Sequence, residues 1–311
     1  MPLVSIVIPT LHRPQLVLRA IRSVLNQTFG EIELIVVVDG PDAVTEAAVR
    51  SISDTRLQLV VNPRSLTAAG ARNVGADHAT GDWIAFLDDD DEWSPNKLER
   101  QMEYAHGMTF VSCLSRVVTP RAAYVRPRLV YDHSVPLDEY LFDRRSLFSE
   151  TGFIQTSSYL LPRSLFDRVR FNVESAHDDW ELILRLSKEP GIRIVTVPEV
   201  LVTLYSEEDR SSLSGRTTWS ASLEWIENMR PIISPRAYSA FCLSVVGSRA
   251  AKEGAHGAFP ELLRRAFWYG SPRFWHVALY FAFWAAPPKV QRRLRAFVRG
   301  RLSEDALEVI K

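Results

Sequence analysis

The sequence predicts an α/β fold with a mostly parallel central sheet flanked by helices, followed by a helical C-terminal region. In the first third of the chain, short apolar runs alternate with amphipathic segments. The strand-like runs are apolar on both faces, as in parallel strands covered by helices. Beyond about Ser214 the pattern is helical to the end, and 311 residues suffice for one large domain or two smaller ones.

The expected elements follow one another closely. Strands are expected at residues 3–8, 32–38, 57–61 and 82–87, with helices at 13–27, 42–53 and 66–78 between them. Further strands are expected at 110–118, 151–161 and 192–197, a helix within 175–186, and a loop with short helices over 121–149. The first helix is typical, because Leu16, Ala20 and Val24 lie on one face at helical spacing.

Charge and cysteine content exclude some classes of partner. Lys+Arg and Asp+Glu balance at 37 each, so nucleic acid is not expected as a main ligand. Cys113 and Cys242 lie far apart and form no metal-spaced pair, which suits a reducing cytosol. The first residues lack a basic lead and a long apolar core, so no signal peptide and a cytoplasmic location are expected.

An acidic run, FLDDDDEW, follows the expected fourth strand, and Asp39 ends the second. Because carboxyl ends of parallel strands meet at one edge of a sheet, both acidic groups should face the same edge. Asp88 and Asp90 have one residue between them and can reach one divalent cation, Mg²⁺ or Mn²⁺. The alternative is a solvated acidic turn before a helix that begins near Ser94.

Several motifs occur together and in order. VSIVIPTLHRP, VVVDGPD and LTAAGARNVGADHATGDWIAFLDDDDEWSPNKLERQ fall within residues 1–105, and ESAHDDWELILRL follows later. This set resembles family 2 glycosyltransferases, which are inverting enzymes with a GT-A fold. The resemblance implies a catalytic domain over 1–215, with a nucleotide-sugar-binding half at 1–105 and an acceptor half at 106–215. Residues 216–311 would form the helical C-terminal region.

The resemblance also implies roles for single residues on the donor side. The base would contact Asp39, and Arg72 would meet the base or order its loop. Asp88 would face the ribose and share the metal with Asp90. The family usually has Asp-Asp-Gly-Ser where this chain has Asp39-Gly40-Pro41-Asp42, so the base itself is not identified. The other residues expected around the nucleotide sugar are Pro9, Thr10, Asp89 in the variable position, Asp91 behind the metal, and Arg210 with Ser211 or Ser212 near the diphosphate.

The later acidic block supplies the candidate catalytic base. Asp178-Asp179 stands where the family has Glu-Asp, whose second member normally takes the proton from the acceptor hydroxyl. Asp179 is therefore predicted as the base, with Asp178 as the second choice. Both could instead be first-turn acids that stabilise their helix. Gln155, Thr156 and Trp180 are expected on the acceptor side.

The end of the chain combines an aromatic run, residues 274–286, with the basic segment 289–301. The apolar run is shorter than the about 20 residues that span a bilayer, and its composition suits a membrane interface. A buried helix pair or a homodimer contact is the alternative. We expect a nucleotide-diphosphate sugar, preferably a UDP-sugar, as donor and an envelope glycan or lipid-linked acceptor at the inner membrane face.

Two other functional classes stay open at this point. A sugar-phosphate nucleotidyltransferase would need a glycine- and lysine- or arginine-rich phosphate loop, and PTLHRP has neither glycine nor lysine. A non-catalytic sugar- or lipid-binding module would not need Asp179.

Overall fold

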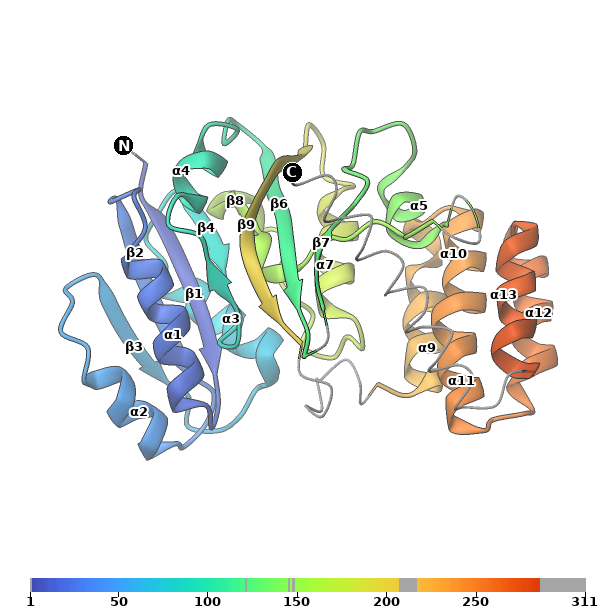
Figure 1. The fold of residues 1–311 in the computed structure, drawn as a ribbon, viewed down its shortest axis with the longest axis horizontal. Helices are drawn as coiled ribbons and strands as arrows, with labels where there is room; N and C mark the ends of the chain where they lie inside the picture. Colours follow the sequence, from blue (N-terminus) through green and yellow to red (C-terminus); the bar gives the residue numbers. More distant parts are fainter. Residues whose placement is uncertain (1, 121, 145, 147–148, 207–216, 286–311) are drawn as a thin grey trace. The chain divides into compact units, whose positions relative to one another are not determined.

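A computed structural model describes residues 2–120, 122–144, 146, 149–206 and 217–285 (Figure 1). The chain forms two compact units. We call them the sheet unit, comprising Met1–Thr119, Ile154–Glu174 and Asp178–Ser206, and the helical unit, comprising Pro120–Phe153, Ser175–His177 and Glu207–Lys311.

The sheet unit contains a mixed sheet with the strand order β3-β2-β1-β4-β8-β6-β9-β5. Strands β1 to β4 are mutually parallel where they pair, β6 and β9 are parallel, and β8 and β5 run antiparallel to their neighbours. The strands are β1 (Val4–Thr10), β2 (Ile32–Val38), β3 (Leu57–Val61), β4 (Trp83–Phe86), β5 (Glu92–Trp93), β6 (Thr109–Val118), β8 (Leu160–Pro162) and β9 (Arg193–Tyr205). The expected α/β class is confirmed.

Helices cover the faces of this sheet (Figure 1). Every residue of β1 is buried, as expected for a parallel strand with helices on both faces. Gly75 lets α3 lie directly on the sheet, because a Cβ atom there would collide with the Val7 side chain. The helices of the unit are α1 (Pro14–Leu25), α2 (Ala43–Arg50), α3 (Thr67–Asp77), α4 (Lys97–Met102), α6 (Arg163–Phe166) and α7 (Asp178–Leu186).

Two expected strands differ from those observed, and two short strands, β5 and β7 (Ala123–Arg126), have no counterpart among the expected elements. The strand expected over 151–161 is wrong: Thr156–Ser158 forms a 3₁₀ turn, and only Leu160–Pro162 pairs as β8. The polar side chains of this segment bind the acidic run instead of lining a strand. Strand β9 continues to Tyr205, well beyond the expected end, and the short strand β5 inside FLDDDDEW was not expected.

The helical unit confirms the expected change of pattern in its described part. Its helices are α5 (Leu137–Phe142), α9 (Trp219–Met229), α10 (Pro235–Phe241), α11 (Gly247–Glu253), α12 (Ala258–Trp268) and α13 (Phe274–Ala285), with a π-helical turn Cys242–Val246 and strand β7 (Ala123–Arg126). An aromatic cluster forms its core, where the Phe241 ring lies 5.0 Å from both Phe142 and Trp225. Among the described helices, none is long and apolar enough to cross a membrane.

Candidate active site

The four aspartates of FLDDDDEW alternate between two environments. The side chains of Asp88 and Asp90 each keep 25% of their surface exposed. Asp89 and Asp91 are buried at 5% and 4% exposure. The run is therefore no evenly solvated turn, since two carboxylates point into the protein and two reach the surface.

Asp89 is bound by the last residue of β1, Thr10, and by Arg13 just beyond it. The Thr10 hydroxyl donates to one carboxylate oxygen at 2.7 Å, and Arg13 donates to the other at 2.8 Å. Burial raises the pKa of Asp89 to about 6, although the Arg13 charge and the Thr10 hydrogen bond oppose the shift. Arg13 also reaches Asp90 at 3.3 Å, so one guanidinium serves two members of the run.

Asp91 is held by the segment that was expected to be a strand. The Ser157 hydroxyl donates to the Asp91 carboxylate at 2.6 Å and accepts from the backbone N–H of Asp88 at 3.1 Å. The Gln155 amide donates to Asp88 at 3.2 Å and to Asp91 at 3.4 Å. Burial, and then the charges of Asp88 and Asp90, raise the pKa of Asp91 well above its usual range.

Gln155 thus belongs to the support of the acidic run, and Thr156 lies next to it in the 3₁₀ turn. Gln155 spans two of its carboxylates, and its own oxygen accepts from the backbone N–H of Ser157 at 2.7 Å. Thr156 is 3% exposed. Their expected place on the acceptor side stays a prediction.

Arg72 joins the acidic run to the later acidic block. Its guanidinium donates to Asp88 at 2.6 Å and to Asp178 at 3.0 Å, and its charge centre lies 5.1 Å from the Phe171 ring. Burial alone would lower the pKa of Arg72, but the carboxylates of Asp88 and Asp178 outweigh it and raise the pKa. The helix α7 starts at Asp178, so this contact places the amino end of α7 beside the end of β4.

Asp179 follows Asp178 directly, but its carboxylate has a different environment. Burial, and then the charge of Asp178, raise the pKa of Asp179 to about 6. Its carboxylate accepts from the backbone N–H of Trp180 at 2.8 Å, and its carbonyl accepts from the Tyr159 hydroxyl at 3.2 Å. Asp178 is thus engaged by Arg72, whereas Asp179 holds a carboxylate with a pKa suited to a proton acceptor near neutral pH.

Asp39 lies at the end of β2 and organises the segment between β3 and α3. Its carboxylate accepts from the Asn62 amide at 2.9 Å, from the Ser65 hydroxyl at 2.8 Å and from the backbone N–H of Leu66 at 2.9 Å. Pro9 lies in β1 beside Val37 of β2. The base-binding role of Asp39 stays a prediction, and Arg210 lies outside the described residues.

Three residues at this site were not predicted as part of it. Arg13 and Ser157 bind the buried aspartates. Arg19 donates to the backbone carbonyl of Asp90, and its charge centre lies 4.0 Å from the Tyr205 ring. A basic residue directly after the first strand, in the motif HRP, was the one available signal, because that strand ends at the same sheet edge as β4.

The residues present suit a divalent cation that is held mainly by phosphates. Asp88 and Asp90 offer hard oxygen donors on the exposed side of the run. The described part of the chain contains no group of three or more His, Cys, Asp or Glu side chains placed to hold a metal ion. Such a donor set fits Mg²⁺ or Mn²⁺ that arrives with a diphosphate, since these ions use one or two protein carboxylates there.

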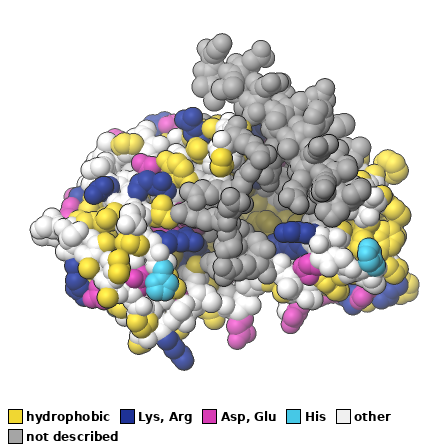
Figure 2. All heavy atoms as spheres, turned by 60° about the horizontal axis from the view of Figure 1, so that its bottom comes forward, with side chains coloured by type: hydrophobic (Ala, Val, Ile, Leu, Met, Phe, Trp, Pro, Cys, Tyr) yellow, Lys and Arg dark blue, Asp and Glu magenta, His cyan; other side chains and the backbone are white. Residues whose placement is uncertain are grey.

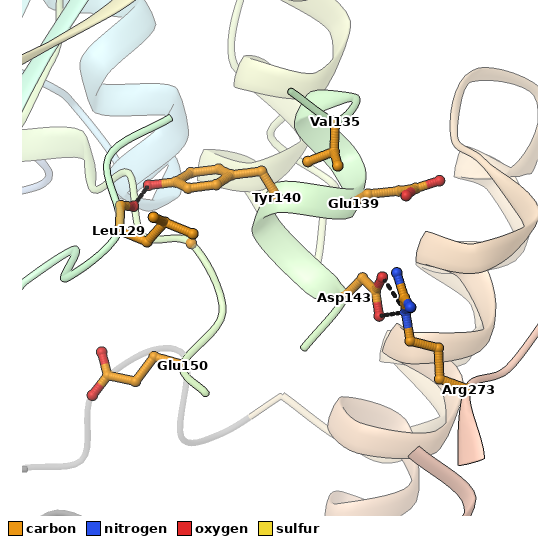
Figure 3. A pocket seen from close by; sticks show the side chains of 8 residues that line it. Leu129, Val135, Glu139, Tyr140, Asp143, Glu150 and Arg273 are labelled. Carbon is orange, nitrogen blue, oxygen red and sulfur yellow. Dashed lines mark hydrogen bonds and ion pairs between the residues drawn. The ribbon is translucent and has the colours of Figure 1, made fainter. Parts of the chain in front are cut away.

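A pocket lies in the helical unit (Figure 3). Asp143 and Arg273 form an ion pair of 2.8 Å on one side of it, and the Tyr140 hydroxyl donates to the Leu129 carbonyl at 2.8 Å on the other. Glu150 also lines this pocket. Its acidic side chains have arginine partners, so it shows ordinary structural pairing.

The comparisons with known proteins identify the family of this chain. The family described as "Glycosyl transferase family 2" matches residues 5–170, more than half of the chain. The chain is 28% identical over 244 residues to the amylovoran biosynthesis glycosyltransferase AmsB of Erwinia amylovora, covering 75% of this chain and 79% of AmsB. It is 43% identical over 100 residues to the glucosyltransferase WfgD of Escherichia coli, covering 32% of this chain and 40% of WfgD.

A solved structure supports the fold. The mannosyltransferase PcManGT of Pyrobaculum calidifontis superposes with a TM-score of 0.53 at 18% identity, covering 99% of this chain and 82% of that one. The chain belongs to the family 2 glycosyltransferases. It is therefore an enzyme, and the nucleotidyltransferase and the binding module are set aside.

Proposed function

We propose that this glycosyltransferase moves a sugar, with inversion, from a nucleotide-diphosphate donor to a glycan or lipid-linked acceptor in cell-surface polysaccharide synthesis. The observation that carries the proposal is Arg72, which holds Asp88 of the donor side and Asp178 of the base block on one guanidinium. A transferase needs these two groups together because the sugar passes from the diphosphate to a hydroxyl that a base activates.

The reaction is one displacement at the anomeric carbon. Asp179 accepts the proton of the acceptor hydroxyl, whose oxygen forms the new bond as the bond to the diphosphate breaks. Attack from the side opposite the leaving group inverts the configuration. Asp178, fixed by Arg72, keeps the start of α7 in place for this step.

The exposed aspartates serve the departing diphosphate. Asp90 and Asp88 would hold Mn²⁺ or Mg²⁺, which when bound neutralises the charge that develops on the leaving group. Thr10 and Arg13 fix Asp89 and thereby the path of the run between the two exposed carboxylates. Asp39 and Pro9 shape the edge that would receive the base, with Arg210 proposed near the phosphates.

Relatives indicate which substrates to test first. WfgD is described as a UDP-Glc:α-D-GlcNAc-diphosphoundecaprenol β-1,3-glucosyltransferase, and AmsB as an amylovoran biosynthesis enzyme. A UDP-sugar donor and a polyprenyl-diphosphate-linked acceptor are therefore our first choices. We place the enzyme in the cytoplasm at the inner membrane face, where such an acceptor is available.

The test is donor turnover with a panel of UDP-, GDP- and dTDP-sugars, in Mn²⁺ buffer and with a detergent-dispersed polyprenyl-diphosphate sugar. We expect one donor to release its nucleotide diphosphate in an acceptor-dependent way, with Asp179→Asn inactive. Release of nucleotide monophosphate, or full turnover by Asp179→Asn, would contradict the proposal.

A further inference from the structure

The turn between α12 and α13 exposes large aromatic side chains. Phe267 is 58% exposed, Trp268 74% and Phe274 81%, and Tyr269 between them is 38% exposed. Exposed aromatic groups of this size at one turn are unusual in a protein surface, where single apolar residues are normally scattered. We call Phe267, Trp268, Tyr269 and Phe274 the aromatic corner.

One face of α13 extends this corner. Phe281 follows Phe274 by two helical turns, so both lie on the same face, and Phe281 is 48% exposed. α13 is anchored through the neighbouring residue Tyr280, which is fully buried and whose ring stacks 5.1 Å from Phe259. The half-exposed Phe281 ring contacts the same Phe259 ring edge-on at 5.3 Å. The twelve residues of α13 contain no charged side chain, and His276 and Tyr280 are the buried ones. Figure 2 shows hydrophobic side chains gathered at the α12–α13 end of the helical unit.

Charge distinguishes two partners that could cover this apolar surface, a second copy of this chain and a lipid membrane. Arg264 is exposed on α12 one turn before Trp268. In sequence, α13 is followed by Lys289, Arg292, Arg293, Arg295, Arg299 and Arg301 with no acidic residue up to Arg301. A second copy of this chain would bring the same positive charges and be repelled, whereas an anionic lipid surface is complementary.

We propose that the aromatic corner inserts into the interface of a membrane that contains anionic lipid. Trp, Tyr and Phe side chains favour this depth, since their apolar rings enter the acyl boundary while polar atoms stay at the headgroups. Arg264 can pair with lipid phosphates, and the positive charge of the sequence that follows α13 favours an anionic surface. The inference rests on the proposed function in that a lipid-linked acceptor would give the enzyme a reason to bind this surface.

The test is binding of the full chain to vesicles of phosphatidylethanolamine and phosphatidylglycerol, with phosphatidylcholine vesicles as the uncharged comparison. We compare the double variant Trp268→Ser/Phe274→Ser with the control Val44→Ser/Val173→Ser, whose side chains are 69% and 49% exposed in the sheet unit. We expect the control to bind as the wild type does. The corner variant should bind at least about tenfold more weakly, because it loses the partial burial of two aromatic side chains.

A second readout separates insertion from charge attraction alone. Lipids with brominated acyl chains should quench part of the tryptophan fluorescence, and Trp268→Phe should lose that part while still binding. Equal binding of wild type and corner variant, or a wild type released completely by high salt, would overturn the proposal. So would a corner variant that keeps its vesicle binding but loses a dimer in light scattering, because the occupant would then be a second copy.

The vesicle-binding and fluorescence measurements do not depend on the enzymatic reaction, because membrane binding needs no donor sugar. The corner variant should turn over detergent-dispersed acceptor at the wild-type rate, since none of its changed residues belongs to the active site. A failure of the membrane inference therefore leaves the transferase assay intact, and a failure of the transferase proposal leaves the vesicle result readable.

Discussion

Arg72 and Asp178 form an ion pair of 3.0 Å between the middle of α3 and the first residue of α7. The same guanidinium binds Asp88 at 2.6 Å, at the carboxyl end of the strand β4. One buried arginine thus fixes the distance between the acidic run and the base block. We therefore predict that Arg72 contributes to catalysis by positioning Asp88 and Asp178, without itself contacting the reacting atoms.

Arg72→Gln should lower kcat/KM by roughly a hundredfold, because misplacing catalytic groups by about 1 Å can cost this much in rate. It should also lower the free energy of unfolding by about 3–5 kcal/mol, the usual cost of losing one partner of a buried charge pair. Asp88 and Asp178 would then repel each other and the start of α7 would shift. Arg72→Lys keeps the charge but cannot bind both carboxylates through a planar fork, so it should recover only part of the rate. Initial rates and thermal unfolding of both variants check this, and a fully active Arg72→Gln would refute it.

The base can be assigned by comparing two neighbouring substitutions. Asp179→Asn should lower kcat by about 10²–10⁴-fold, the usual contribution of a general base. Asp178→Asn keeps a hydrogen-bond acceptor for Arg72 and should lose less. The reverse order of the two effects would move the base to Asp178.

The pH dependence follows from the raised pKa of Asp179, about 6. A base works only when it is deprotonated, so kcat should fall as pH is lowered through about 6 and should be level above about 7. Asp178→Asn removes the like charge beside Asp179, so its acid limb should move to lower pH. A rate profile from pH 5 to 8 in the presence of saturating substrates measures the shift, and identical acid limbs would contradict the interaction.

Much of the sheet could be predicted from sequence because its strands are short, mainly apolar runs between polar segments. The expected limits 32–38 and 57–61 coincide with β2 (Ile32–Val38) and β3 (Leu57–Val61). β2 is almost entirely apolar and buried, and β3 is a half-exposed edge strand with one polar residue, Gln58, so a local pattern suffices to define both. The prediction for segment 151–161 was wrong because its conformation is not set by a local pattern. It depends on hydrogen bonds from Gln155 and Ser157 to aspartates far away in the chain.

In the candidate site, too, residues with a local sequence pattern could be predicted, and residues that meet only in the folded chain could not. The spacing of Asp88 and Asp90 is local, and sequence alone indicated them as a pair at a sheet edge. The partners of Asp89 and Asp91 were not visible, because Arg13 and Ser157 meet them only after β1, β4 and β8 have come together. Residues that only bind and position another side chain, such as Arg13 and Ser157, do not form a motif with a fixed spacing in the sequence.

Removal of the metal gives a further prediction. Asp90→Ala should abolish transfer while the thermal unfolding temperature changes little, because the side chain is partly exposed and Arg13 keeps its shorter ion pair with Asp89. Wild-type enzyme treated with chelator should lose activity and regain it with Mn²⁺ or Mg²⁺. Full activity of the variant, or of chelated wild type, would remove the metal from the proposal.

The raised pKa of Asp89 predicts how the free energy of unfolding depends on pH in metal-free buffer. Its pKa in the folded protein is about 6, above the ordinary value of 3.8, so the folded state holds a proton that the unfolded chain has released between these pH values. The free energy of unfolding should therefore fall as pH rises from about 4 to about 6, by at most about 3 kcal/mol from this one group. Above that range the buried carboxylate is charged and its cost is fully present.

Asp89→Asn removes this titration, since the amide stays neutral and its oxygen can still accept from Thr10. Relative to wild type, the variant should thus gain stability as pH rises from 4 to 7 in urea unfolding with chelator present. Asp54→Asn is the matched control, because the pKa of Asp54 is lowered to about 2 by Arg56 and the group does not titrate in that range. If the stability difference for Asp89→Asn stays as flat with pH as that for Asp54→Asn, the carboxylate of Asp89 is ionised throughout. The Arg13 ion pair, rather than burial, would then dominate its environment.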